Sequence, residues 1–111
     1  MQTAKLSDFI GGWFLGNFQP SLCQTPHVEV ALKRHKAGEP WPMHGQQVAT
    51  EYNLVVTGRL VLTNPQGEEQ AFNDGDLFVI PPGEAWQPSF VGDCTVVCVK
   101  VPSVPGDKVC V

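Results

Sequence analysis

The chain has 111 residues, of which 42% are hydrophobic and only 16% are charged, a balance that predicts one compact domain and excludes a disordered chain. Its formal net charge of −4 gives no electrostatic support for binding nucleic acid or an anionic membrane surface. No apolar run approaches the roughly 20 residues of a membrane-spanning helix, and the first residues lack a small-residue cleavage pattern, so we expect a cytoplasmic protein without a signal peptide.

Residues 1–26 are rich in aromatic side chains and keep no strand or helix periodicity for more than a few residues. Such a segment is expected to pack as an arm over a sheet edge, either of its own domain or of a neighbouring copy. We therefore predict a homodimer. Core or interface packing is the favoured role for Trp13, and a ligand contact is the alternative.

The next segment, from His27 to His35, alternates apolar and polar residues as a half-buried strand does. Its apolar parity consists of Val28, Val30 and Leu32. Because His27 and His35 fall on the polar parity, we interpret both as surface or strand-end histidines, with ligation by His35 as the alternative. The basic run 33–36 is interpreted as a solvated rim, and an anion site is the alternative.

Beyond residue 48, short apolar runs alternate with turns rich in Gly, Pro, Asn and Asp, which is typical of an all-β protein. The predicted strands cover 49–57, 59–63, 70–72, 77–80, 84–90 and 93–101. The tail 102–111 is too rich in proline for a central strand and is expected to lie along a sheet edge. The chain is thus predicted to be a single domain, with an arm (1–26), a β core (27–101) and a tail (102–111).

The cysteines lack the spacing of a zinc site. Cys94 and Cys98 share one face of a predicted strand, but four residues at about 3.3 Å each place them roughly 13 Å apart, too far for a disulfide. We expect all four cysteines to be free thiols, namely Cys23, Cys94, Cys98 and Cys110.

Polar residues with ligand chemistry lie at fixed offsets inside the strand-like pattern of residues 38–58. Five residues separate Gly38 from His44, one separates His44 from Gln46, four separate Gln46 from Glu51, and six separate Glu51 from Gly58. This spacing resembles the first motif of the cupin superfamily, in which two histidines and a glutamate lie between the two glycines.

A second segment, 75–90, resembles the second cupin motif and begins 17 residues after the first one ends. Gly75 is followed after five residues by Pro81, after one more by Gly83, and after two more by Trp86, at the place of the family's metal-binding histidine. The resemblance spans nearly the whole chain and is to small bacterial cupins of unassigned activity. It implies a single-domain, all-β cupin-type barrel, also called a double-stranded β-helix or jelly roll.

The family's motifs supply three imidazoles and one carboxylate to a metal ion, and this chain keeps only part of that set. Gln46 and Trp86 replace two histidines; an amide oxygen is a weak ligand for transition metals, and an indole N–H can only donate. The metal ligands implied by the resemblance are therefore His44, Gln46 and Glu51. Whether a divalent transition metal binds, with His35 or Cys98 as a further ligand, stays open.

The same resemblance implies a barrel pocket in which His44 is the acid or base and Glu51 orients it or stabilises its charge. Strand alternation places Asn53 and Val55 on the face of Glu51, so both are predicted to line the pocket with Gln46. A buried Glu51 must meet a metal, a base or hydrogen-bond donors. Trp86 is predicted to form an aromatic wall for a sugar ring or another planar ligand.

The leading hypothesis is a pocket for a small polar, carbohydrate-like molecule, and whether a reaction occurs there stays open. One alternative is a metal-independent isomerase or epimerase of nucleotide-linked sugars. Another is a metal-dependent oxygenase or lyase. A hydrogen-bonded His44–Glu51 pair inherited with the fold, without any substrate, is the interpretation that needs no function.

Overall fold

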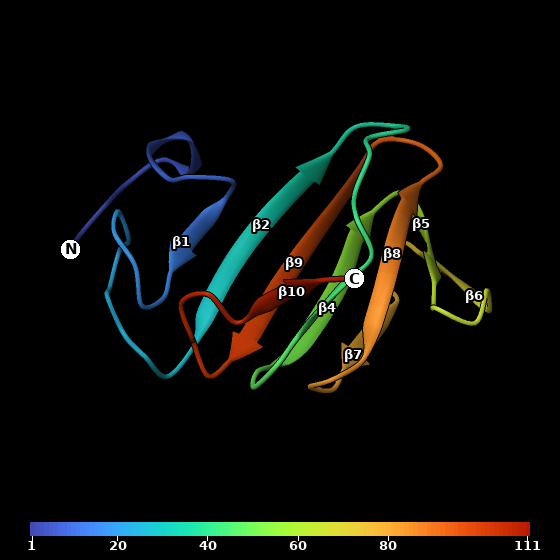
Figure 1. Ribbon diagram of the computed structural model, residues 1–111. Coiled ribbons are helices and arrows are strands. Elements are labelled where there is room, and N and C mark those ends of the chain that lie inside the picture. Colours follow the sequence, from blue (N-terminus) through green and yellow to red (C-terminus); the bar gives the residue numbers. More distant parts are fainter.

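A computed structural model describes residues 1–111, with ten strands and one short 3-10 helix (Figure 1). The elements are η1 (Leu6–Asp8), β1 (Trp13–Leu15), β2 (Glu29–His35), β3 (His44–Gln46), β4 (Thr50–Thr57), β5 (Arg59–Thr63), β6 (Glu69–Asn73), β7 (Leu77–Ile80), β8 (Ala85–Phe90), β9 (Cys94–Val101) and β10 (Lys108–Cys110). None of its helices is long and apolar enough to cross a membrane.

The strands form two five-stranded sheets whose strand pairs are all antiparallel. One sheet has the order β1-β2-β9-β4-β7 and the other has the order β10-β3-β8-β5-β6. Apart from the hairpins β1–β2 and β5–β6, consecutive strands alternate between the sheets, and the connections wrap the chain into a roll (Figure 1). The predicted all-β, cupin-type barrel is confirmed.

Strand positions agree closely with the sequence pattern. The predicted strands 59–63 and 77–80 are observed with the same bounds as β5 and β7. The tail forms β10, an edge strand that pairs with β3, as its proline content indicates. All four cysteines are free, as expected.

The hydrophobic core lies between the two sheets. Its buried residues come from β4, β5, β8 and β9, and they are Val55, Leu60, Leu62, Phe90, Cys94 and Val96. Complete burial of one such aliphatic or aromatic side chain contributes about 1.5–3 kcal/mol to stability. This cluster fixes the distance between the sheets and so determines how much space remains beside it.

The turn between β4 and β5 moves the chain from one sheet to the other, and Gly58 makes it feasible. Gly58 has a φ of +101°, and a Cβ there would lie 2.4 Å from the Asp93 carbonyl oxygen. The Asp74 carboxylate accepts a hydrogen bond from the Gly58 N–H at 2.6 Å. The last glycine of the first motif therefore has a structural role.

The orientation of β2 is opposite to the sequence prediction. Ala31, on the supposed polar parity, is fully buried, and Lys33 and His35 on the same face line an internal cavity. The apolar parity lies on the outer face, where Val30 and Leu32 are half-buried. The alternation misleads because the inner face of β2 borders a polar cavity while its outer face is largely apolar.

The N-terminal arm packs against its own barrel. β1 pairs with the outer edge of β2, and the Gly12 carbonyl accepts a hydrogen bond from the Leu32 N–H at 3.1 Å. Figure 1 shows this blue segment beside β2, at the open edge of the first sheet. The arm thereby brings Trp13 to the mouth of the cavity.

Candidate functional site

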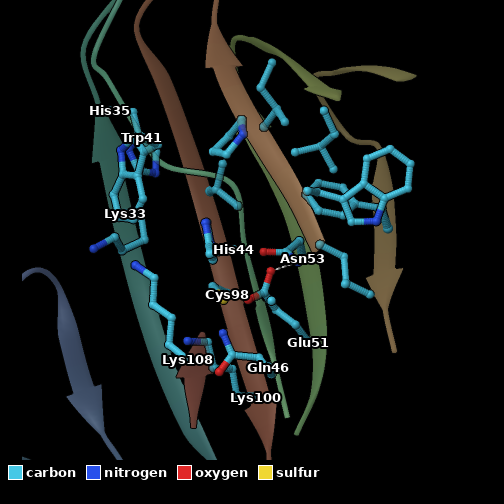
Figure 2. A pocket seen from close by; sticks show the side chains of 18 of the residues that line it. Lys33, His35, Trp41, His44, Gln46, Glu51, Asn53, Cys98, Lys100 and Lys108 are labelled. Carbon is cyan, nitrogen blue, oxygen red and sulfur yellow. Dashed lines mark hydrogen bonds between the residues drawn. The ribbon is translucent and has the colours of Figure 1, made fainter. Parts of the chain in front are cut away.

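A cavity of about 170 Å³ opens between the sheets and is lined by both of them (Figure 2). An apolar cavity of about 150 Å³ is large enough for benzene. The space therefore admits a compact organic group. It is bounded on one side by core residues such as Leu60 and Phe90 and on the other by polar side chains.

Five of the predicted site residues line this cavity together. We call them the motif group: His44, Gln46, Glu51, Asn53 and Trp86. Val55, which was also predicted to line it, does not do so, because it is fully buried in the core cluster. The structure thus brings five of these six positions to one cavity and places Val55 in the core.

Close packing of β3 against β8 places His44 directly opposite Trp86. The approach requires Gly45, since a Cβ at that position would lie 2.2 Å from the Glu84 carbonyl oxygen. Trp86 also packs against the hydrophobic core. Its side chain therefore forms a wall of the cavity and leaves the space open.

Glu51 is satisfied by a neighbour on its own strand. The Asn53 side-chain amide donates a hydrogen bond to a Glu51 carboxylate oxygen at 3.0 Å, drawn as the dashed line in Figure 2. The requirement for a donor is met in this way. Cys98, the cross-strand partner of Asn53, also lines the cavity, and burial raises the pKa of its thiol well above the usual value.

His44 is held by the backbone instead of by Glu51. Its Nδ1 donates a hydrogen bond to the Pro42 carbonyl oxygen at 2.9 Å, and no hydrogen bond joins it to Glu51. Burial lowers the pKa of His44 below its usual value, which outweighs the opposing effects of the Pro42 carbonyl and Glu51. The imidazole is therefore neutral at pH 7, with Nε2 as its basic nitrogen. The expected orientation of His44 by Glu51 is not observed.

A second set of residues reaches the same cavity from strands that carry no cupin motif. We call it the lysine group: Trp13, Lys33, Trp41, Lys100 and Lys108. The lysines come from β2, β9 and β10, and Trp41 from the connection before β3. The predicted solvated rim is thus wrong for Lys33, although its neighbours Arg34 and Lys36 are exposed.

The lysine ammonium groups lie over the two tryptophan rings. Lys33 Nζ is 5.9 Å from the Trp13 ring centroid and 5.5 Å from that of Trp41. Lys100 lies 4.8 Å from the Trp13 centroid, and Lys108 lies 4.7 Å from the Trp41 centroid. Cation–π contacts of this kind hold an ammonium group without neutralising its charge.

A third feature of the cavity is a carboxylate-bound histidine. The Glu39 carboxylate accepts a hydrogen bond from His35 Nδ1 at 2.7 Å and another from the Trp41 indole N–H at 2.7 Å. The hydrogen bond from His35, and after it the one from Trp41, lowers the pKa of Glu39 to about 2. Burial lowers the pKa of His35. The His35 ring stacks on the Phe90 ring with a centroid distance of 4.0 Å. His35, interpreted as a surface residue, is only 10% exposed in its side chain.

These donors do not fit the metal ion implied by the resemblance. No three His, Cys, Asp or Glu side chains come together as a ligand set. Trp86 can only donate, Gln46 offers a neutral amide, and three ammonium groups face the space that a cation would occupy. No chemical step through a metal follows from this pocket.

Sequence reasoning missed Lys33, Lys100 and Lys108 as lining residues and gave His35 only as an alternative ligand. A usable signal existed on β2, where Lys33 and His35 share the parity of the small residue Ala31. For Lys108 the signal was absent, because a tail with two prolines does not reveal its strand register.

Known proteins support the fold independently. A structure from Klebsiella pneumoniae, described as an uncharacterized conserved protein with a double-stranded β-helix domain, superposes with a TM-score of 0.74 at 15% identity, covering 98% of this chain and 90% of that one. The DMSP lyase from Ruegeria pomeroyi superposes with a TM-score of 0.73 at 13% identity, covering 88% of this chain and 49% of that one. A sugar phosphate isomerase from Silicibacter pomeroyi superposes with a TM-score of 0.59 at 24% identity, covering 69% of this chain and 52% of that one.

These neighbours have different activities, so their likeness supports the architecture and assigns no reaction. A search of curated proteins finds no match to the sequence. The family model described as "Cupin domain" matches residues 28–101, from β2 to the end of β9. Since this match covers well over half of the chain, the protein belongs to the cupin family.

Proposed function

We propose that this protein binds a small polar organic molecule inside the barrel, with His44 and Glu51 at the centre of the site. The observation that carries the proposal is the convergence of the motif group on one cavity of about 170 Å³. Ligand pockets in proteins combine apolar walls with a few converging polar groups, and this cavity has both.

The division of roles follows from the contacts. Trp86 and the core residues beside it supply a flat apolar surface, against which a sugar ring or another planar body can stack. His44 offers a neutral imidazole with its Nδ1 proton fixed by Pro42. Glu51 and Asn53 form a hydrogen-bonded pair that can accept hydrogen bonds from hydroxyl groups and donate hydrogen bonds to them.

A second candidate function is metal-independent proton transfer, as in an isomerase or epimerase. One observation favours it: the cavity has two imidazoles, since His35 lies there as well as His44. Each donates Nδ1–H to a fixed acceptor and keeps Nε2 as a base. For a nucleotide-linked sugar, a cavity of this size accommodates only the reacting part of the molecule.

Thermal-shift measurements on the full chain test the proposal. Glucose, glucose 6-phosphate, UDP-glucose and benzyl alcohol serve as probes, each at about 5 mM, and a ligand present at about 100 times its Kd stabilises the fold by about 2.7 kcal/mol. We expect at least one probe to raise the Tm of the wild type and to lose most of its effect in His44→Gln. Glu69→Gln, an exposed change on β6, is the matched control. A flat response to every probe would contradict the proposal.

A further inference from the structure

The three lysines of the cavity have no carboxylate partner. No lysine or arginine forms an ion pair with a carboxylate, and the one contact of that kind joins the His35 ring to Glu39. Lys100 has two acidic cross-strand neighbours, Glu29 and Glu51, but each carboxylate accepts a hydrogen bond from another side chain, that of Ser103 and of Asn53 respectively.

This concentration of positive charge runs against the charge of the whole chain. The protein has a net charge of −4, yet three of its seven Lys and Arg residues line one small cavity. The pKa of Lys33 is lowered, chiefly by burial; the charges of Lys108 and Lys100 also lower it, while Cys98 and Glu39 raise it. Lys33 is held there by a hydrogen bond from its ammonium group to the Gly11 carbonyl oxygen at 2.8 Å.

An independent observation comes from Gln46 in the motif group. Its side chain lines the cavity, is only 5% exposed, and has an amide nitrogen, Nε2, without any hydrogen-bond partner. A buried donor without an acceptor is rare in folded proteins and calls for a specific explanation. Gln46 is the direct cross-strand partner of Lys108, so this donor lies beside one of the ammonium groups.

The unpaired groups at this end of the cavity are therefore donors. Figure 2 shows Lys100, Lys108 and Gln46 together on the side of the cavity away from His35, and Lys33 between them and His35. Ammonium groups and an amide N–H₂ are complemented by a group that only accepts hydrogen bonds and carries negative charge.

We propose that Lys33, Lys100, Lys108 and Gln46 form an oxyanion subsite, and that the ligand of this protein is a small organic acid held by its carboxylate or phosphate group. This inference rests on the proposed function, because it names the group by which the ligand is held. The acid's compact body would then lie against the aromatic and apolar walls near His44 and Trp86. Trp13, supplied by the N-terminal arm, closes the subsite next to Lys33 and Lys100.

Matched probes that differ in charge test this directly. Benzoate and phenyl phosphate carry the two candidate oxyanions, benzyl alcohol is their neutral counterpart, and inorganic phosphate separates a free ion from an organic acid. Binding to the full chain is followed by tryptophan fluorescence, since Trp13 and Trp41 lie at the subsite, and by thermal shift. We expect at least one organic anion to bind ten times more tightly than benzyl alcohol and to weaken as salt is raised.

Variants then locate the effect. We expect Lys108→Met and Gln46→Leu each to weaken anion binding by about tenfold or more, and Lys108→Arg to retain most of the affinity. Lys36→Met removes an exposed charge that follows β2 and does not line the cavity, so this variant should bind like the wild type. Because Lys108 is exposed at its strand edge, its variants are expected to fold, which circular dichroism checks.

The inference is overturned if benzyl alcohol binds as tightly as both organic anions, if no anion binds, or if Lys108→Met binds anions like the wild type. Tighter binding of inorganic phosphate than of phenyl phosphate would also overturn the proposal that the ligand is an organic acid. The subsite can fail while the proposed function survives. A neutral probe such as glucose that binds, and whose binding is weakened by His44→Gln but not by Lys108→Met, would preserve the pocket and remove the subsite.

Discussion

The motif group and the lysine group line one cavity from neighbouring strands, but they arise from the sequence in different ways. The motif group lies at the fixed offsets of two cupin motifs, on β3, β4 and β8. The lysine group comes from β1, β2, β9, β10 and one loop, at positions that neither motif fixes. The first group has lost two of the family's four ligands, and the second adds positive charge where a metal ion would be held.

This difference indicates how one barrel serves different chemistries. The motif positions bring their side chains to one cavity although two of the family's metal donors are absent, and the surrounding strands add lysines to the same cavity. The two groups meet at Gln46, which belongs to a motif by its position and to the lysines by its contacts.

Restoring the two missing histidines should restore metal binding. We expect the Gln46→His/Trp86→His variant to hold about one equivalent of Zn²⁺ or a similar ion after dialysis, because it brings three imidazoles and Glu51 to one site. The wild type should hold far less than one equivalent. The metal content is measured on protein purified without a histidine tag. One tightly bound metal equivalent in the wild type that is lost in His44→Ala would contradict our account of the motif group.

Removing the link between β10 and the motif strands should cost the most stability. Asp107, which is 5% exposed, accepts hydrogen bonds at 2.9 Å from the Val48 and Ala49 N–H groups, the latter buried. We expect Asp107→Ala to lower the free energy of unfolding by about 3 kcal/mol, measured by urea denaturation, because it leaves two N–H donors unsatisfied. Asp93→Ala, an exposed aspartate with one backbone bond, should cost about 1 kcal/mol or less.

The predicted homodimer can be located on a surface that neither group uses. The outer face of β4 and β7 exposes Tyr52, Leu77 and Val79, and Val79 is 54% exposed. Light scattering should give about twice the chain mass of 12.1 kDa, and Val79→Lys should shift the mass toward one chain. Since one chain supplies both groups, ligand binding should survive this change. A wild-type protein with the mass of a single chain would refute the dimer.

Stability should also fall modestly in mild acid. Burial lowers the pKa of both His35 and His44 below the usual value of 6.5, so the unfolded chain takes up protons first as the pH falls. The stabilising effect of the neutral rings is complete above about pH 6.5 and decreases toward the lower pKa of the folded state. The Tm should therefore fall between pH 7.5 and 5.5. Glu39 stays ionised in this window, since its pKa is about 2. A Tm that rises on acidification would contradict the assignment.

The sequence predicted the β architecture and most of the motif group, because turn residues and fixed offsets constrain local structure strongly. It failed at β2, where Lys33 and His35 lie on the inner face although alternation favoured the apolar parity. Periodicity reports which parity is apolar and cannot tell whether the interior is dry. It also failed at Lys108, because only tertiary pairing of the tail brings that residue beside Gln46.

A double-mutant cycle for benzoate or phenyl phosphate binding tests most directly whether the two groups hold one ligand. Calorimetric titration compares the wild type, His44→Ala, Lys108→Met and the double variant. We predict that each single change weakens binding and that their effects are non-additive by at least about 0.5 kcal/mol, as expected for residues acting on a shared ligand. Unchanged affinity in Lys108→Met, or strict additivity, would contradict the claim of a single anion-binding site.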